Sequence, residues 1–170
     1  SCTGVAIISV DNSLRILLEF ARGGDSKDVF YRGLRAQLMK IVQGRKLRFF
    51  VCEEPVPAKG KQYASKTLIE LRGRVAEWRE DIYELSTAKF DSIYPQSWKS
   101  VVVDKKKGTN RSNDKVCIAE DICDIFPEYK MYFRFGFNKD YDGFDATGIL
   151  LGYRKLAYSE DGVEKIWSKQ

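Results

Sequence analysis

The most regular pattern in the chain is a helical one between residues 68 and 85. Apolar side chains recur there three and four residues apart, the spacing that places them on one face of an α-helix. These side chains are Leu68, Leu71, Val75, Trp78, Ile82 and Leu85. A second apolar row flanks them at seven-residue spacing and consists of Ile69, Ala76 and Tyr83. So wide an apolar face predicts extensive burial, either against a sheet alone or against a sheet and a second subunit.

Segments with strand character alternate with helical segments on both sides of this helix. Residues 3–10 and 14–21 are apolar and β-branched, and the turn residues between them predict a hairpin. Further strands are expected over 46–54 and 89–95, and further helices over 29–42, 96–103, 116–125 and 142–154. The order ββ-α-β-α-β-α-α predicts the α/β class, with a mixed β-sheet flanked by helices.

Composition limits the kind of protein further. A length of 170 residues with 44% apolar side chains suits one domain over 1–170, in which the tail 156–170 receives no assignment. No apolar stretch approaches about 18 residues, so no membrane partner is expected. The four cysteines lack C-x-x-C spacing, which favours reduced side chains and a cytoplasmic location, in a bacterium or a phage-infected cell. The absence of a Gly-rich phosphate loop argues against a small-molecule cofactor.

The chain contains no histidine. This excludes zinc-protease motifs and nucleophiles activated by histidine. Any metal ion must therefore be held by oxygen ligands, which suits Mg²⁺ or Mn²⁺. The net charge of +5 leans towards a polyanionic partner.

Carboxylates stand at two places where chemistry is expected. Asp142 and Asp145 open the last helix, where they either cap it, with Asp142 as the N-cap residue, or bind a metal ion. Glu53 and Glu54 end the apolar run that begins at Phe49, so they are either a solvated strand end or part of the same site. Three or four such oxygen ligands can hold two divalent ions that clamp a phosphate.

Five short motifs resemble one known family. "SCTGVAII", "FFVCEEP", "YPQSWKSVV", "NRSNDK" and "DGFDA" occur in this order over residues 1–153. Together they resemble the RuvC-type Holliday junction resolvases, and the compact phage-type members most. The resemblance implies an RNase H-like fold, a homodimer, and cleavage of four-way DNA junctions with two Mg²⁺ ions per active site held by four carboxylates.

The resemblance also implies roles for single residues. Glu53 matches the strand-end glutamate, with Glu54 as its neighbouring alternative, and Asp142 and Asp145 match the closing D-x-x-D-A. Lys99 and Lys115 match lysines that the family uses near the DNA phosphate or the developing charge.

One part of the family pattern is missing. The family's first strand ends in an aspartate shortly before a T-G pair, which Thr3 and Gly4 match, and neither that strand nor its aspartate precedes them here. We therefore expect about ten more residues upstream in the natural protein, enough for one strand. Asp11 also follows a strand-like segment, but its turn context favours a hairpin role over a catalytic one.

Basic and aromatic side chains mark the expected DNA surface. Lys59, Lys61 and Tyr63 lie in a loop after Glu53, where the lysines could reach a junction and the tyrosine could stack on a base. A second basic loop holds Lys105, Lys106, Lys107 and Arg111, and the segment before Asp142 adds Lys130, Arg134 and Lys139. For either loop the alternative is a solvated surface.

The expected function is a Mg²⁺-dependent, structure-selective endonuclease acting on four-way and other branched DNA. Two alternatives stay open. One is another RNase H-like nuclease that cuts hybrid or flap substrates. The other is a catalytically degenerate DNA-binding protein.

Overall fold

The computed structural model describes residues 2–8, 14–21, 23–56, 62–104, 115–130 and 141–158. The chain divides into two compact units. Unit 1 joins Ser1–Ala21 to Pro95–Gln170, and unit 2 is the continuous stretch Arg22–Tyr94 between them. The prediction of one domain over the whole chain stays a prediction.

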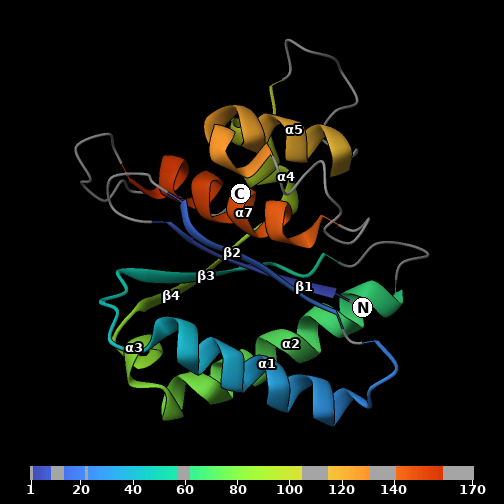
Figure 1. Ribbon diagram of the computed structural model, residues 1–170, viewed down its shortest axis with the longest axis vertical. Coiled ribbons are helices and arrows are strands. Elements are labelled where there is room, and N and C mark those ends of the chain that lie inside the picture. The colour runs from blue at the N-terminus through green and yellow to red at the C-terminus, as the bar shows by residue number, and fades with distance from the viewer. Residues whose placement is uncertain are drawn as a thin grey trace. The chain divides into compact units, whose positions relative to one another are not determined.

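Unit 1 is built on a β-hairpin. Strands β1 (Cys2–Ile8) and β2 (Leu14–Ala21) pair antiparallel, with Cys2 opposite Ala21 and a register shift between Ile7 and Ile8. This confirms the hairpin expected from the sequence. The helix α7 (Asp142–Ala157) packs along β1, as Figure 1 shows.

Two further helices of unit 1 pack on α7. They are α4 (Pro95–Val102) and α5 (Lys115–Ile125), and a 3₁₀ turn, η3 (Pro127–Tyr129), follows α5. Trp98 of α4 is fully buried and lies directly against two glycines of α7, Gly148 and Gly152. Because these positions carry no Cβ, the tryptophan can approach the α7 backbone closely. The core of unit 1 is therefore centred on the contact between α4 and α7.

Unit 2 contains a parallel strand pair. Strands β3 (Phe49–Glu53) and β4 (Lys89–Ile93) run in the same direction, and the rings of Phe50 and Phe90 stack with centroids 5.8 Å apart. Parallel strands need a long crossover connection, which here contains the helix α2 (Gln62–Asp81). The strand β3 is shorter than the predicted 46–54, and its side chains are half-buried where burial was expected.

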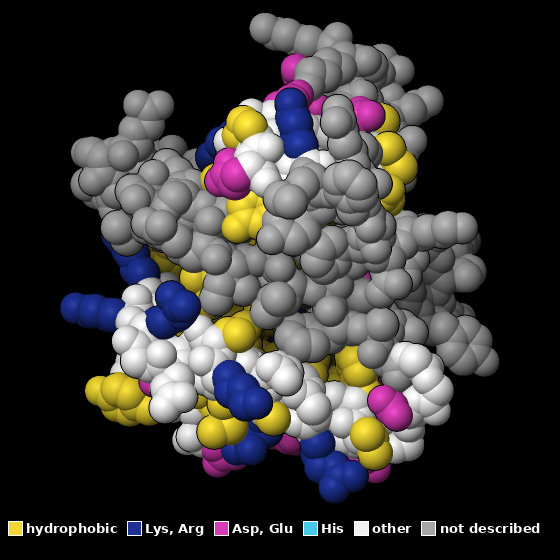
Figure 2. All heavy atoms as spheres, viewed as in Figure 1, with side chains coloured by type: hydrophobic (Ala, Val, Ile, Leu, Met, Phe, Trp, Pro, Cys, Tyr) yellow, Lys and Arg dark blue, Asp and Glu magenta, His cyan; other side chains and the backbone are white. Residues whose placement is uncertain are grey.

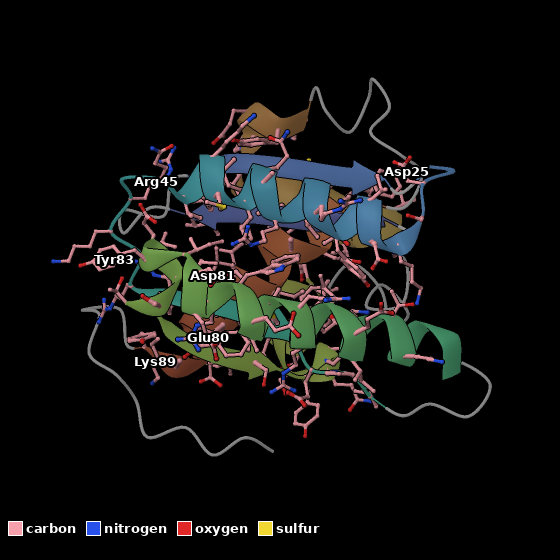
Figure 3. The ribbon with its side chains drawn as sticks, turned by 90° about the horizontal axis from the view of Figure 1, so that it is seen from below. Asp25, Arg45, Glu80, Asp81, Tyr83 and Lys89 are labelled. Atoms are coloured by element: carbon pink, nitrogen blue, oxygen red, sulfur yellow. The ribbon has the colours of Figure 1, made fainter. Side chains whose placement is uncertain are left out.

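Helix α1 (Lys27–Val42) lies beside α2 in unit 2, as Figure 3 shows. Ser26 caps α1 by accepting a hydrogen bond from the backbone N–H of Val29. Ion pairs connect the helices: Lys27 with Glu70 at 2.6 Å and Arg35 with Asp81 at 2.9 Å. The surface in Figure 2 shows exposed apolar side chains interspersed with lysines and arginines over the part of the molecule that holds these helices.

The long predicted helix ends earlier than its apolar pattern. After α2 the backbone of Ile82 is extended, and a separate turn of helix, α3 (Tyr83–Ser86), follows. Both Ile82 and Leu85 are nonetheless buried, so the break keeps the apolar face while the chain turns towards β4. Polar groups stabilise the turn, since the hydroxyls of Ser86 and Thr87 donate to the carbonyl of Tyr83. Apolar periodicity therefore correctly predicted the burial of Val75, Trp78, Ile82 and Leu85. Its prediction of one continuous helix through these residues was wrong.

The α/β class is confirmed. The described strands form two two-stranded sheets, one antiparallel and one parallel. The helices over α1, α4, α5 and α7 begin and end within a few residues of their predicted bounds. None of the described helices is long and apolar enough to cross a membrane.

Candidate functional site

One lysine and two aspartates of unit 1 meet at the start of α7. The Nζ atom of Lys115, the first residue of α5, lies 2.6 Å from Oδ1 of Asp142 and 3.5 Å from Oδ2 of Asp145. The side chains of Asp142 and Asp145 are only 21% and 24% exposed, whereas that of Lys115 is 46% exposed. Both carboxylates therefore converge on a single cationic group that solvent can still reach.

The backbone at the start of α7 sets the direction of these carboxylates. Tyr141 adopts a left-handed conformation (φ 48°, ψ 29°), and its carbonyl accepts hydrogen bonds from the N–H groups of Phe144 and Asp145. The ring of Tyr141 packs near that of buried Phe144, with the two ring centroids 6.1 Å apart. Tyr141 is thus the N-cap residue, and α7 begins at Asp142.

This geometry corrects the capping interpretation. Asp142 is not the N-cap residue, and the side chain of the N-cap residue, Tyr141, makes no capping hydrogen bond. Its carboxylate instead accepts a hydrogen bond from Lys115. The positive end of α7 still favours both negative charges, so the position stabilises the carboxylates without using them as caps.

The two aspartates raise the pKa of the Lys115 ammonium group. Burial acts to lower the pKa of its ammonium group, but the hydrogen bond with Asp142 and the charge of Asp145 outweigh it and hold the pKa above its usual value. Lys115 therefore stays protonated and balances the two carboxylates.

Lys99 comes from α4 in the same unit. It follows Trp98, and its ammonium group lies 5.4 Å from the centre of that indole ring, within the range of a cation–π contact. Trp98 is packed against α7 and Lys99 follows it directly. The packing of α4 on α7 therefore also sets the backbone position from which the Lys99 side chain extends.

The two glutamates at the end of β3 have different surroundings in unit 2. Glu54 forms a 2.6 Å ion pair with Arg72 of α2, and its N–H donates to the carbonyl of Ile93, which extends the parallel ladder by one bond. Glu53 is the half-buried last residue of β3. Burial also raises the pKa of the adjacent Cys52 thiol to about 12, so this thiol is unreactive at neutral pH. The ion pair with Arg72 gives Glu54 a structural role.

The structure brings together three of the predicted site residues: Asp142, Asp145 and Lys115. Glu53 belongs to unit 2 and the aspartates to unit 1, so the grouping of all three carboxylates stays a prediction. Within each unit, the described residues hold no group of three His, Cys, Asp or Glu side chains arranged around a common point. The donor chemistry of the aspartates nevertheless fits a hard cation, because two carboxylates already face one positive charge.

Most of the predicted DNA-contacting residues lie outside the described residues. These are Lys59, Lys61, Lys105, Lys106, Lys107 and Arg111, together with Asp11, Arg134 and Lys139. Tyr63 lies inside α2 and not in the preceding loop, so its assignment to a loop was wrong. Lys130 faces Asp124 at 3.7 Å.

Sequence reasoning missed the residues that support the site. Trp98, Gly148 and Gly152 set the distance between α4 and α7, and Tyr141 sets the first turn of α7. A signal for the first group was present, because two glycines four residues apart inside a helix share one face and leave room for a neighbour. Comparisons of the chain with protein-family models, curated proteins and solved structures found no match.

Proposed function

We propose that the protein is a Mg²⁺-dependent, structure-selective endonuclease that cleaves four-way DNA junctions and other branched DNA. The observation that carries the proposal is the convergence of Asp142 and Asp145 on the ammonium group of Lys115. A pair of mostly enclosed carboxylates beside a lysine supplies two features of a phosphodiester-cleaving site: oxygen ligands for a divalent ion and a positive charge for the phosphate.

An RNase H-like fold is part of this proposal. A β-hairpin, a helix, and two parallel strands joined through a helix follow one another along the chain, and this order supports the proposal. The proposed site takes the strand-end Glu53 from the parallel pair and the aspartates from α7.

The proposed roles follow from residue type and position. Asp142, Asp145 and Glu53 would hold Mg²⁺, or Mn²⁺ in its place, through their carboxylate oxygens. When bound, two such ions supply an activated water and stabilise the leaving oxygen. Lys99 and Lys115 would bind the phosphate and offset the charge that develops on it. The lysines of the two basic loops would bind the arms of the junction.

The test is cleavage of a synthetic four-way junction by the natural full-length protein, with and without Mg²⁺. We expect Asp145→Asn to abolish Mg²⁺-dependent nicking while junction binding survives, because the substitution removes a ligand charge and leaves the basic surface intact. Asp124→Asn is the matched control, since Asp124 is an exposed carboxylate on α5 of the same unit. Cleavage by Asp145→Asn at the wild-type rate contradicts the site assignment.

A panel of substrates separates the related activities. Four-way junctions, forks, flaps and RNA–DNA hybrids are offered at equal concentration. Preference for the four-way junction supports a resolvase, and preference for hybrids or flaps supports another RNase H-like nuclease. Junction binding without any Mg²⁺-dependent nicking supports a DNA-binding protein with a degenerate site and overturns the proposed enzyme.

A further inference from the structure

Lys115 occupies the place that a metal ion would take between the two aspartates. Its ammonium group is within 2.6 Å of one carboxylate and 3.5 Å of the other. An ion bonded to the same oxygens at about 2.1 Å would lie within a few ångströms of that ammonium, where like charges repel strongly. The lysine and a divalent ion therefore cannot both hold these positions.

The attraction that keeps Lys115 in place comes from α7 and not from its own helix. Lys115 is the first residue of α5, where the positive helix end disfavours a cation, and the first turn of α5 contains no acidic residue. Its side chain is nearly half exposed and has a flexible four-carbon stem. Lys115 can therefore leave the carboxylates without disturbing a packed core.

We propose that Lys115 is a built-in competitor for the metal ion: its ammonium group neutralises Asp142 and Asp145 until a divalent cation displaces it. The proposal rests on the proposed function, because it concerns the same pair of carboxylates. Displacement leaves the amine able to reach a phosphate, the role that the proposed function gives it. It also makes metal binding an exchange of cations, so the measured affinity is weaker than that of the two aspartates alone.

The first experiment measures Mg²⁺ affinity by calorimetry for the wild type, Lys115→Met and Lys155→Met, without DNA. We expect Lys115→Met to bind Mg²⁺ about tenfold more tightly than the wild type, a change equivalent to 1.4 kcal/mol. Lys155→Met is the matched control. Lys155 lies near the opposite end of α7, where its ammonium group donates to the carbonyl of Val101.

Three results of this titration overturn the proposal. They are equal affinity in the wild type and Lys115→Met, weaker affinity in Lys115→Met, and no Mg²⁺ binding by either protein. Mg²⁺ binding by Lys115→Met alone supports it, since the competitor is then strong enough to exclude the ion. When D142N and D145N are added to Lys115→Met, the gained binding must be lost; retention of that gain places the ion elsewhere and also overturns the proposal.

A second measurement needs no variant and decides the matter if Lys115→Met does not fold. The wild-type protein is treated briefly with an amine-acetylating reagent, with and without Mg²⁺, and modification is measured by mass spectrometry. We expect modification of Lys115 to rise severalfold with Mg²⁺ while that of Lys155 stays constant. Modification of Lys115 that is unchanged or reduced by Mg²⁺ overturns the proposal.

These readouts separate this inference from the proposed function. Mg²⁺-driven release of Lys115 without junction cleavage supports the competitor and overturns the endonuclease. Junction cleavage without release of Lys115 supports the endonuclease and overturns the competitor.

Discussion

Asp142 and Asp145 face two sources of positive charge. The positive end of α7 lies beneath both side chains, and the ammonium group of Lys115 lies against them. A helix end contributes about 0.3–1 kcal/mol to a nearby carboxylate, and a charge-assisted hydrogen bond contributes about as much again or more. Two acidic groups can therefore stay close together and mostly enclosed without a metal ion.

Tyr141 introduces local strain where this turn begins. A left-handed backbone costs a residue with a side chain about 1–2 kcal/mol, and the cost is larger for β-branched residues. We expect Tyr141→Val to lower the free energy of unfolding by about 1–2 kcal/mol more than Tyr141→Asn does. Both substitutions remove the ring contact with Phe144, but asparagine tolerates the left-handed conformation.

Urea unfolding of the two Tyr141 variants measures this difference. Equal midpoints and slopes would mean that the backbone of Tyr141 carries no strain and that only the ring contact matters.

For single residues, the sequence predicted the candidate site residues more readily than the residues that position them. The sequence indicated the aspartates because two acids head an apolar helix, and the resemblance implied Lys115. It did not indicate that Tyr141 would be the N-cap residue, because bulky aromatic residues are not typical there. The side-chain ion pair of Glu54 with Arg72 was equally unpredictable, since eighteen residues separate the partners.

Among the elements, α4 and α7 approach each other closely at two glycines. A Cβ atom added at Gly152 would lie 2.4 Å from Cβ and 2.7 Å from Cα of Trp98, and one added at Gly148 would lie 2.5 Å from its ring. Because Trp98 is fully buried, neither contact can be relieved by turning a side chain into solvent. The two helices must separate instead.

We expect Gly152→Ala to destabilise the protein by about 1–3 kcal/mol, the range for overpacking a well-packed core. Nicking of the junction should fall as well, because Lys99 moves with α4. Gly73→Ala is the matched control, since nothing lies within 4 Å of a Cβ at that position of α2 and alanine favours a helix. Thermal unfolding of both variants tests this, and a Gly152→Ala melting temperature at or above the wild-type value contradicts the close packing.

The flanking apolar row faces solvent, with Ile69 and Ala76 on α2 and Tyr83 on α3. Ile69 is 59% and Tyr83 is 77% exposed, and Ala76 between them is exposed too. The sequence left two interpretations of the wide apolar face: burial against a sheet alone, or against a sheet and a second subunit. The first interpretation does not account for this row, because the row is exposed. Such a row of exposed apolar side chains suits the homodimer that the resemblance implies, which stays a prediction.

If the chain forms the homodimer that the resemblance implies, we expect Ile69→Lys to shift it from dimer to monomer, because the substitution places a charge in the apolar row. Light scattering after size-exclusion chromatography measures the mass directly. Gln37→Lys adds the same charge to an exposed position of α1 and should leave the dimer intact. A dimer of undiminished strength in Ile69→Lys would place the interface elsewhere.

Local periodicity predicted the helices well because an apolar stripe at helical spacing marks the face that packs on a neighbour. It failed at Ile82, where the apolar spacing continues through an extended residue. It also could not show that the tryptophan before Lys99 fills the space left by two glycines fifty residues later, since that contact depends on tertiary packing.

In the whole molecule, the proposed site is distributed along the chain. Glu53 ends β3 in unit 2, and the two aspartates lie in the first turn of α7 in unit 1, so a site that combines them stays a prediction. The spacing of residues along a sequence does not show whether residues as far apart as Glu53 and Asp142 meet in the fold. The α/β class could be predicted from the order of elements, whereas the combination of acids, expected from the strand-end position of Glu53 and from the resemblance, stays a prediction.

The net charge of +5 makes the whole molecule attractive to DNA, but local lysines should determine how strongly salt weakens binding. Each phosphate neutralised contributes about 0.9 to the slope of log affinity against log salt for duplex DNA. We expect the triple variant K105A/K106A/K107A to reduce that slope by roughly two to three, because each lysine would contact one phosphate.

Junction binding at several salt concentrations, followed by fluorescence anisotropy, measures the slope. The triple variant K27A/K40A/K46A removes the same charge from exposed lysines of unit 2 and serves as the control. If net charge alone governs binding, both triple variants weaken it equally. A larger loss of slope in K105A/K106A/K107A shows instead that the basic loop contacts the phosphates, and equal losses would remove this loop from the proposed DNA surface.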